Sequence, residues 1–112
     1  MLDLNELTKV TLANVERRQR NGANIKTDTV SMIKHCSTEV VEAMEAYAKL
    51  KYFPQLNANE TEIIKKEFAS ELSDIICCAL TIAGKENIDI EKTVLDCIEK
   101  NRKRAEGKGD KL

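Results

Sequence analysis

The chain has little of what β-rich and membrane-spanning proteins need. It contains no tryptophan, one proline and four glycines in 112 residues, and aromatic residues make up only 4%. Alanine, leucine, isoleucine, glutamate and lysine dominate instead, as they do in helical proteins. No apolar run approaches the roughly 20 residues that a transmembrane helix needs. We therefore expect an all-α protein with no membrane partner.

The chain also has no large excess of positive or of negative charge. The formal net charge is -1, which gives no overall attraction to nucleic acid or to an anionic membrane. Arg17, Arg18 and Arg20 form a short basic cluster, but no nucleic-acid-binding motif surrounds it. The N-terminus lacks the basic and apolar regions of a signal peptide. The four cysteines form no C-x-x-C pair, so a cytoplasmic location is expected.

Length and periodicity predict one domain of four helices. We assign residues 1–106 to this domain and residues 107–112 to a flexible charged tail. Asn59, followed by Glu62, resembles a capping box for the third helix. Short loops predict that the second and third helices pack as an antiparallel hairpin. The helices are expected at residues 4–20, 28–52, 60–86 and 90–105.

The expected core lies along the second and third helices. The third helix is nearly all apolar over residues 72–83, so we expect it to be the most buried element. One hairpin with two flanking helices leaves apolar surface uncovered, which predicts a helical bundle completed as a homodimer or homotetramer. The core stripe expected on the second helix consists of Ile33, Val40, Val41, Met44 and Ala48.

Two pairs of acids stand out within these apolar stretches: Glu39 and Glu42, then Glu71 and Asp74. The spacing of three places each pair on one helix face, about one turn apart. Both pairs lie about fifteen residues from the centre of the intervening turn, so an antiparallel hairpin brings them to the same height. Converging carboxylates repel one another unless a cation lies among them. Mg²⁺ prefers such oxygen ligands.

The alternative is that these acids belong to an ordinary solvated face, since 33% of the chain is charged. Asp74 is followed at once by four apolar residues, and Glu42 lies between Val41 and Ala43. No lysine or arginine stands four residues from any of the four acids to neutralise it. The matched heights then favour the metal-binding interpretation.

The pattern E-x-x-E, a spacer and then E-x-x-D on an all-α hairpin resembles the MazG-type nucleotide pyrophosphohydrolases. That superfamily also includes dimeric dUTPases, dCTP pyrophosphatases and phosphoribosyl-ATP pyrophosphatase. The resemblance covers residues 33–104. Residues 88–92 are similar to the family's turn into its last helix. Residues 100–104 are similar to the K-x-N-x-x-R-type motif with which the family ends. Many members begin the first motif with two adjacent acids, and here Thr38 takes the first of those positions.

The resemblance implies Mg²⁺-dependent cleavage of a nucleoside triphosphate into a monophosphate and pyrophosphate, with Mn²⁺ as a possible substitute. The implied metal ligands and catalytic residues are Glu39, Glu42, Glu71 and Asp74. One of these, or Glu67 one turn earlier, would orient the attacking water as a base. The expected phosphate-binding residues are Lys34, Lys100, Asn101 and Arg104.

Two alternatives stay open at this point. The first is phosphoribosyl-ATP pyrophosphatase, which performs the same chemistry on another substrate. The second is a non-catalytic helical module that binds a nucleotide or a partner protein, which the threonine at position 38 keeps open. Metal-dependent turnover distinguishes an enzyme from a binding module.

Overall fold

The computed structural model describes residues 3–53 and 55–107, and within these residues the chain is entirely helical, with no strand. The all-α expectation is therefore confirmed. No helix among the described residues is both long and apolar enough to cross a membrane. Apart from Gly107, the segment expected to form a flexible tail lies outside the described residues. The helices are α1 (Leu4–Arg20), α2 (Thr29–Tyr52), α3 (Ala58–Lys85) and α4 (Ile90–Ala105).

A short polar side chain caps the N-terminus of each helix, as backbone amides without helical partners require. Asp28 caps α2 and Asp89 caps α4. Gly22, with φ of 95°, follows the C-cap residue Asn21 of α1 as a left-handed C′ glycine.

The capping box of α3 is formed by Asn57 and Glu60, not by Asn59 and Glu62 as the sequence indicated. The Asn57 side chain accepts from the Glu60 amide at 2.8 Å, and the Glu60 carboxylate accepts from the Asn57 amide at 3.4 Å. The N-x-x-E pattern occurs twice in succession, at positions 57 and 59. The earlier copy determines where the helix begins, so α3 begins two residues before the position that the sequence predicted.

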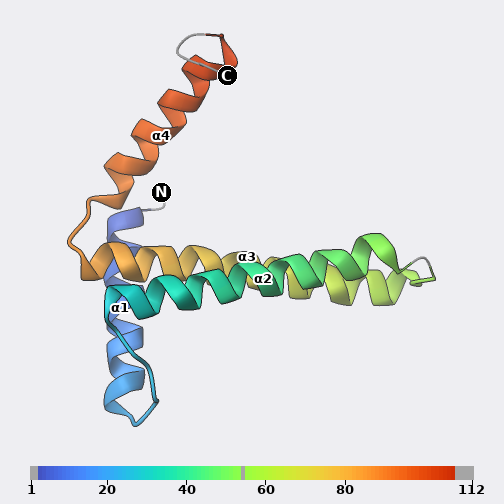
Figure 1. The fold of residues 1–112 in the computed structure, drawn as a ribbon, viewed down its shortest axis with the longest axis horizontal. Helices are drawn as coiled ribbons and strands as arrows, with labels where there is room; N and C mark the ends of the chain where they lie inside the picture. Colours follow the sequence, from blue (N-terminus) through green and yellow to red (C-terminus); the bar gives the residue numbers. More distant parts are fainter. Residues whose placement is uncertain (1–2, 54, 108–112) are drawn as a thin grey trace.

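The fold is built on a long hairpin of α2 and α3, with the shorter helices attached at one end (Figure 1). Helix α1 crosses the C-terminal part of α3, and α4 packs mainly on α1 before it extends away from the hairpin. Gly84 permits the α1 crossing, because a Cβ atom there would lie 2.9 Å from Thr8 Cγ2.

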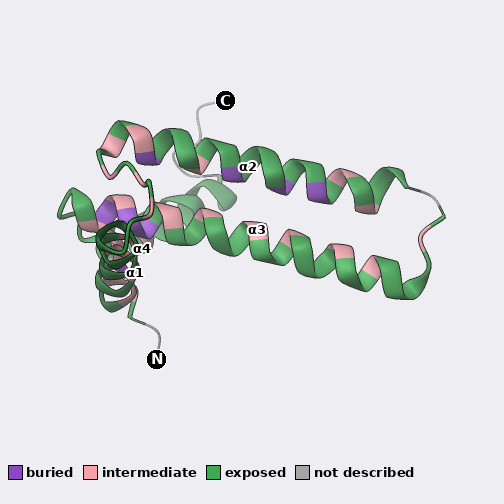
Figure 2. Cartoon of the chain, turned by 90° about the horizontal axis from the view of Figure 1, so that it is seen from below, coloured by how far each residue is buried: buried purple, intermediate pink, exposed green. Residues whose placement is uncertain are grey.

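A thin buried seam joins α2 to α3 (Figure 2). On α2 the buried residues recur every three or four positions, or at twice that spacing, which is the period of one helix face. They are Met32, Glu39, Ala43 and Ala46. Towards the hairpin turn the rings of Tyr47 and Phe68 lie 5.5 Å apart. The buried residues that α2 contributes to the seam are therefore one methionine, one acid and two alanines.

The core stripe predicted on α2 is wrong by about one residue. Ile33, Val40, Val41 and Met44 are exposed, and Ala48 is half-buried. Each residue turns about 100° around a helix, so the position before or after a seam residue faces sideways. The prediction followed the largest apolar side chains, whereas the seam follows Met32, Glu39 and Ala43.

Helix α3 is likewise less buried than the sequence predicted. Leu72 and Ile76 are exposed. Only its C-terminal part, where α1 crosses, contains buried residues, namely Leu80, Thr81 and Ala83. The fully buried residues of α3 therefore lie where α1 crosses it, and the middle of the helix keeps one open side.

Candidate functional site

Three of the four predicted acids converge at the middle of the hairpin seam. Glu39 and Glu42 come from α2 and Glu71 comes from α3, and each offers a carboxylate oxygen within 4.8 Å of the others. Equal distances from the hairpin turn place the two helices' acids at one height, as the spacing predicted. We call Glu39, Glu42 and Glu71 the carboxylate cluster.

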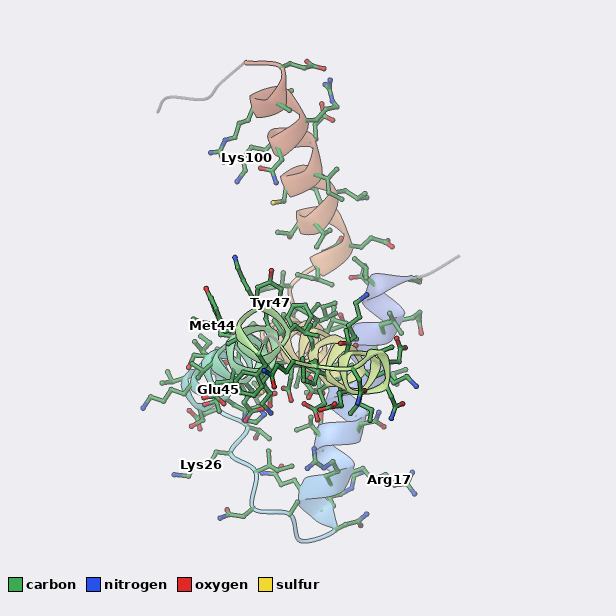
Figure 3. The ribbon with its side chains drawn as sticks, turned by 90° about the vertical axis from the view of Figure 1, so that its right-hand side faces the viewer. Arg17, Lys26, Met44, Glu45, Tyr47 and Lys100 are labelled. Carbon is green, nitrogen blue, oxygen red and sulfur yellow. The ribbon has the colours of Figure 1, made fainter. Side chains whose placement is uncertain are left out.

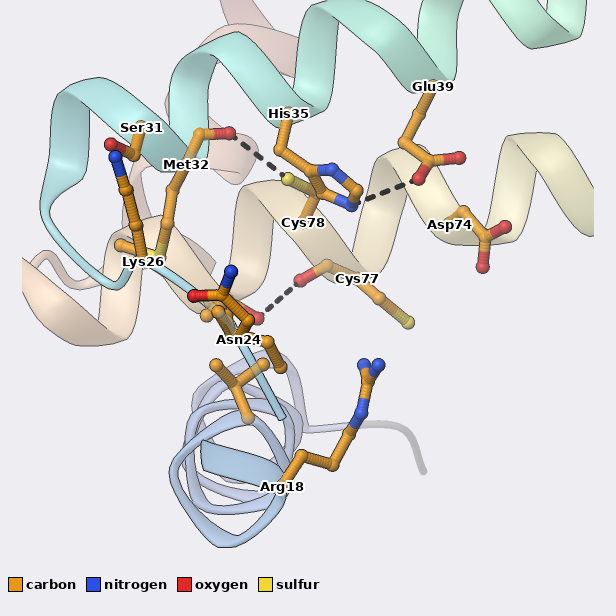
Figure 4. Close-up of a pocket in the computed structure, with 13 residues that line it drawn as sticks. Arg18, Asn24, Lys26, Ser31, Met32, His35, Glu39, Asp74, Cys77 and Cys78 are labelled. Carbon is orange, nitrogen blue, oxygen red and sulfur yellow. Dashed lines mark hydrogen bonds and ion pairs between the residues drawn. The ribbon is translucent and has the colours of Figure 1, made fainter. Parts of the chain in front are cut away.

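Asp74 lies one helical turn beyond Glu71 and stands outside this 4.8 Å group. It is exposed, and it lines the cavity beside the cluster together with Glu39 (Figure 4). The structure therefore places Asp74 beside the cluster but not within it.

The carboxylate cluster is partly withdrawn from water. Glu39 is only 9% exposed, and its Oε1 lies 3.0 Å from His35 Nε2. The other oxygen of Glu39, and Oε2 of Glu71, are buried without a hydrogen-bond partner among the described residues. Buried oxygens of this kind are uncommon, because the lost hydration is not replaced. A bound cation is one group that replaces it.

The electrostatics of the cluster are unfavourable without a cation. Burial, together with the neighbouring carboxylates of Glu42 and Glu39, raises the pKa of Glu71 to about 7. Near neutral pH, Glu71 is therefore shared between its protonated and ionised forms. A divalent cation reverses this effect, because it stabilises the ionised form. The donor set thus fits a hard metal ion such as Mg²⁺.

Glu67, the further residue expected to orient water, lies on α3 one turn before Glu71. Its carboxylate is 3.8 Å from Lys49 Nζ on α2, and both side chains are about half exposed. This ion pair connects the two helices on the side of the hairpin that carries Glu42. Glu67 is therefore close to the cluster but already has a cationic partner.

The residues expected to bind phosphate are not brought to the cluster within one chain. Lys34 is exposed on α2. Lys100, Asn101 and Arg104 lie on α4, which points away from the hairpin (Figures 1 and 3). Asn101 Nδ2 donates to Cys97 Sγ of its own helix at 3.8 Å. The sequence correctly placed Lys100, Asn101 and Arg104 on the last helix, but it did not predict the direction in which that helix runs from the hairpin.

A cavity of about 660 Å³ adjoins the carboxylate cluster. It lies between α1, the loop after α1 and the hairpin (Figure 4). Arg18 of α1 and Lys26 of the loop both line it, and neither forms an ion pair with another described residue. Its other lining residues are Val15, Asn24, Ile25, Ser31, Met32, His35, Glu39, Asp74, Cys77, Cys78 and Thr81.

Arg18 and Lys26 are the cations that sequence reasoning missed. The only signal was the basic run at positions 17–20, and it does not tell which member faces the hairpin. That information comes from the crossing of α1 over α3. The cavity is consequently lined by two acids of the hairpin, Glu39 and Asp74, and by two cations of α1 and the loop after it, Arg18 and Lys26.

Cys78, a half-buried residue of the cavity wall, is unsuited to act as a nucleophile. Burial, followed by the nearby Cys36 thiol, raises the pKa of Cys78 to about 12. Because the thiolate is the reactive form, Cys78 is inert near neutral pH. All four cysteines are free.

No family model, curated protein or solved structure matches the chain.

Proposed function

We propose that this chain is a Mg²⁺-dependent nucleotide pyrophosphohydrolase of the MazG-like type. It would cleave a nucleoside triphosphate between the α- and β-phosphates and release a monophosphate and pyrophosphate. The observation that carries the proposal is the carboxylate cluster, in which two buried oxygens have no partner among the described residues. The resemblance in the motif spacing supplies the reaction, and the cluster supplies a place for the cation.

Glu39, Glu42 and Glu71 are the proposed ligands, and Asp74 is the proposed fourth. Mg²⁺, or Mn²⁺ in its place, would neutralise phosphate oxygens and make the phosphorus more open to attack. The chain's own residues support the ligands: α2 and α3 are connected beside the cluster by the Lys49–Glu67 pair, and His35 contacts Glu39. A carboxylate of the set, or Glu67, would accept the proton of the attacking water.

The cavity beside the cluster supports a substrate of nucleotide size. Its volume of about 660 Å³ falls within the roughly 300–1,000 Å³ that is usual for small-molecule sites. Arg18 and Lys26 are placed to contact phosphate oxygens, since guanidinium and ammonium groups form strong charge-assisted hydrogen bonds with them. In this proposal they take the role that the sequence suggested for Lys34 and for the end of α4.

The proposal includes an enzyme that acts in the cytoplasm on free nucleotides, with no nucleic acid as partner. The net charge of -1 supports this, because nucleic-acid binding generally relies on a basic surface. The family resemblance also implies more than one copy of the chain, as a homodimer or a homotetramer.

The test is pyrophosphate release from a panel of canonical and damaged nucleoside triphosphates, with phosphoribosyl-ATP included. Each substrate is assayed with Mg²⁺ and with EDTA. The proposal expects release from at least one nucleoside triphosphate that EDTA abolishes. Pyrophosphate release from phosphoribosyl-ATP alone would show that the reaction type is right and that the proposed substrate is wrong. Silence across the panel contradicts the proposal and favours a non-catalytic binding module.

A further inference from the structure

Two of the four cysteines lie at matching positions of the hairpin seam. Residues that face the opposite helix recur at alternating steps of three and four, which is the period of one helix face. On α2 the buried and half-buried positions include 32, 36, 39, 43 and 46. On α3 the half-buried positions include 64, 68, 71, 75 and 78. Cys36 and Cys78 therefore both belong to the seam.

The register of the hairpin places these two cysteines at the same height. The rings of Tyr47 and Phe68 lie 5.5 Å apart, which fixes one pair of opposite positions on α2 and α3. Cys36 lies eleven residues before Tyr47, and Cys78 lies ten residues after Phe68. Since the helices are antiparallel, these two distances differ by about one residue, or roughly 1.5 Å along the axis. Cys36 and Cys78 are thus opposite each other.

The Cys78 thiol reaches the backbone of α2 at this height. Its Sγ donates to the carbonyl oxygen of Met32 at 3.5 Å (Figure 4). In an α-helix a carbonyl also accepts the amide of the residue four positions later, and for Met32 that residue is Cys36. Burial, followed by the Cys36 thiol, raises the pKa of Cys78, so the two thiols interact directly. Cys78 Sγ therefore lies against the turn of α2 that carries Cys36.

Neither of the other two cysteines can replace a member of this pair. Cys77 lies about 100° away from Cys78 around α3, and it is exposed on the cavity wall. Adjacent Cα atoms are about 3.8 Å apart, which is shorter than the roughly 4.4–6.8 Å that disulfides span. Cys97 belongs to α4, which points away from the hairpin (Figure 1). The geometry leaves Cys36 with Cys78 as its partner.

We propose that Cys36 and Cys78 form an oxidation site, at which a hydroperoxide such as hydrogen peroxide converts the two thiols into a disulfide between α2 and α3. Cys36 lies one turn before Glu39, and Cys78 lies one turn after Asp74. The bond closes residues 37–77 into a loop. It therefore fixes the separation of the two helices beside the carboxylate cluster.

The reaction proceeds in two steps. Hydrogen peroxide takes two electrons from the Cys36 sulfur, its O–O bond breaks, and a sulfenic acid and one water form. The Cys78 sulfur then bonds to the Cys36 sulfur, and the S–O bond breaks. The hydroxyl group leaves as a second water with the Cys78 proton. Two thiols and one peroxide thus give one disulfide and two waters.

The contact between the thiols determines the order of these steps. Because its pKa is about 12, Cys78 is a thiolate in only about 1 of 10⁵ chains at neutral pH. It is therefore a poor nucleophile towards molecules that arrive from solution, and the peroxide reacts with the half-buried Cys36. A sulfenic acid at Cys36 is instead held against Cys78. Effective concentrations of roughly 10⁵ M or more, which groups held in contact can reach, offset so small a thiolate fraction.

The test is peptide mapping of the reduced protein before and after treatment with hydrogen peroxide, at micromolar concentration so that links between chains are disfavoured. The oxidised wild type is expected to lose two hydrogen atoms in mass. It should contain a disulfide between the tryptic peptides that carry Cys36 and Cys78, and dithiothreitol should remove it.

Three variants identify the sulfur atoms. Cys36→Ser and Cys78→Ser should each abolish the link. Cys77→Ser is the matched control, because it removes the neighbouring thiol of the same tryptic peptide, and it should form the link as the wild type does. A link that survives in Cys78→Ser, or that is lost in Cys77→Ser, would overturn the inference.

A second measurement uses the wild type alone, so that it does not depend on how the variants fold. The midpoint of thermal unfolding should rise by several degrees after oxidation and return after dithiothreitol, because a disulfide that closes a long loop restricts the unfolded chain. Oxidation of the wild type without a link between the two peptides would contradict the inference. The link is independent of the proposed hydrolysis, so either can fail without the other.

Discussion

At the scale of single residues, the most informative feature is the conflict among Glu39, Glu42 and Glu71. Three carboxylates share a partly buried space, and two of their oxygens are without a partner among the described residues. Such an arrangement costs stability when all three carboxylates are ionised, and either protonation of one of them or a bound cation would relieve that cost. The cost is visible in the pKa of Glu71, which burial and its acidic neighbours raise to about 7.

The raised pKa predicts how stability depends on pH. The pKa of Glu71 is about 7 in the folded chain and 4.5 for an ordinary glutamate, so the folded state binds more protons between these values. Without metal, this group's contribution to stability is greatest below about pH 4.5 and is lost as the pH rises through 7. The metal-free protein should melt a few degrees lower at pH 8 than at pH 5.5.

Magnesium should reverse that difference, because it stabilises the ionised form that dominates at pH 8. Thermal melts followed by circular dichroism, with and without millimolar Mg²⁺, measure both effects. Glu71→Gln is the control, since it removes the titrating group and should melt higher than the wild type at pH 8 without metal. Equal stabilisation by Mg²⁺ in Glu71→Gln and in the wild type would show that the ion binds elsewhere.

Arg18 is predicted to contact the substrate and not the metal. Arg18→Ala should raise KM by about tenfold, which corresponds to the loss of one charge-assisted hydrogen bond. Arg17→Ala is the matched control, because Arg17 is its neighbour on α1 but does not line the cavity. Steady-state kinetics on the preferred nucleotide measure both variants. An unchanged KM in Arg18→Ala, or an equal rise of KM in Arg17→Ala, would show that α1 does not contact the substrate through Arg18.

At the scale of secondary structure, the helices follow directly from local chemistry. Aspartates cap α1, α2 and α4, an asparagine caps α3, and a glycine ends α1. These signals lie within a few residues of the boundary they determine, so the sequence predicted every helix to within two residues. The start of α3 was displaced because two copies of the same capping pattern overlap.

The position of that capping box leads to a direct comparison. Asn57→Ala should lower the free energy of unfolding by about 1 kcal/mol, the usual value of an N-cap side chain. Asn59→Ala should change it little, because Asn59 lies in the first turn of α3 and is not its N-cap residue. Urea denaturation of both variants measures the difference. If Asn59→Ala lowered the free energy of unfolding more than Asn57→Ala, the capping box would be the one that the sequence indicated, formed by Asn59 and Glu62.

At the scale of the whole molecule, the carboxylate cluster was predictable because it depends only on the hairpin. Equal distances from one turn determine the height of the acids on both helices, and no other element is involved. The cavity was not predictable, because Arg18 and Lys26 reach it only through the crossing of α1. The direction of α4 was not predictable either, because α4 packs mainly on α1 and not on the hairpin.

The exposed apolar residues show a second limit of sequence patterns. Ile33, Val40 and Met44 were expected to lie inside the chain because they are large and apolar, yet all three are exposed. Periodicity identifies a helix side that avoids water, but it does not distinguish a partner within the chain from a second chain. Within the chain, the predicted burial of these side chains is therefore wrong.

The sharpest test of the metal site is the turnover of Glu71→Gln beside that of Glu45→Gln, on the best substrate and with Mg²⁺. Both changes remove one carboxylate, but Glu45 is exposed on α2 and lies outside the carboxylate cluster. Glu71→Gln should lose more than about 100-fold in kcat, since even residues that only support a metal ligand cost about 10–100-fold. Glu45→Gln should keep the wild-type rate. Undiminished turnover in Glu71→Gln, with its helical content intact, would contradict the claim that this cluster holds the catalytic metal.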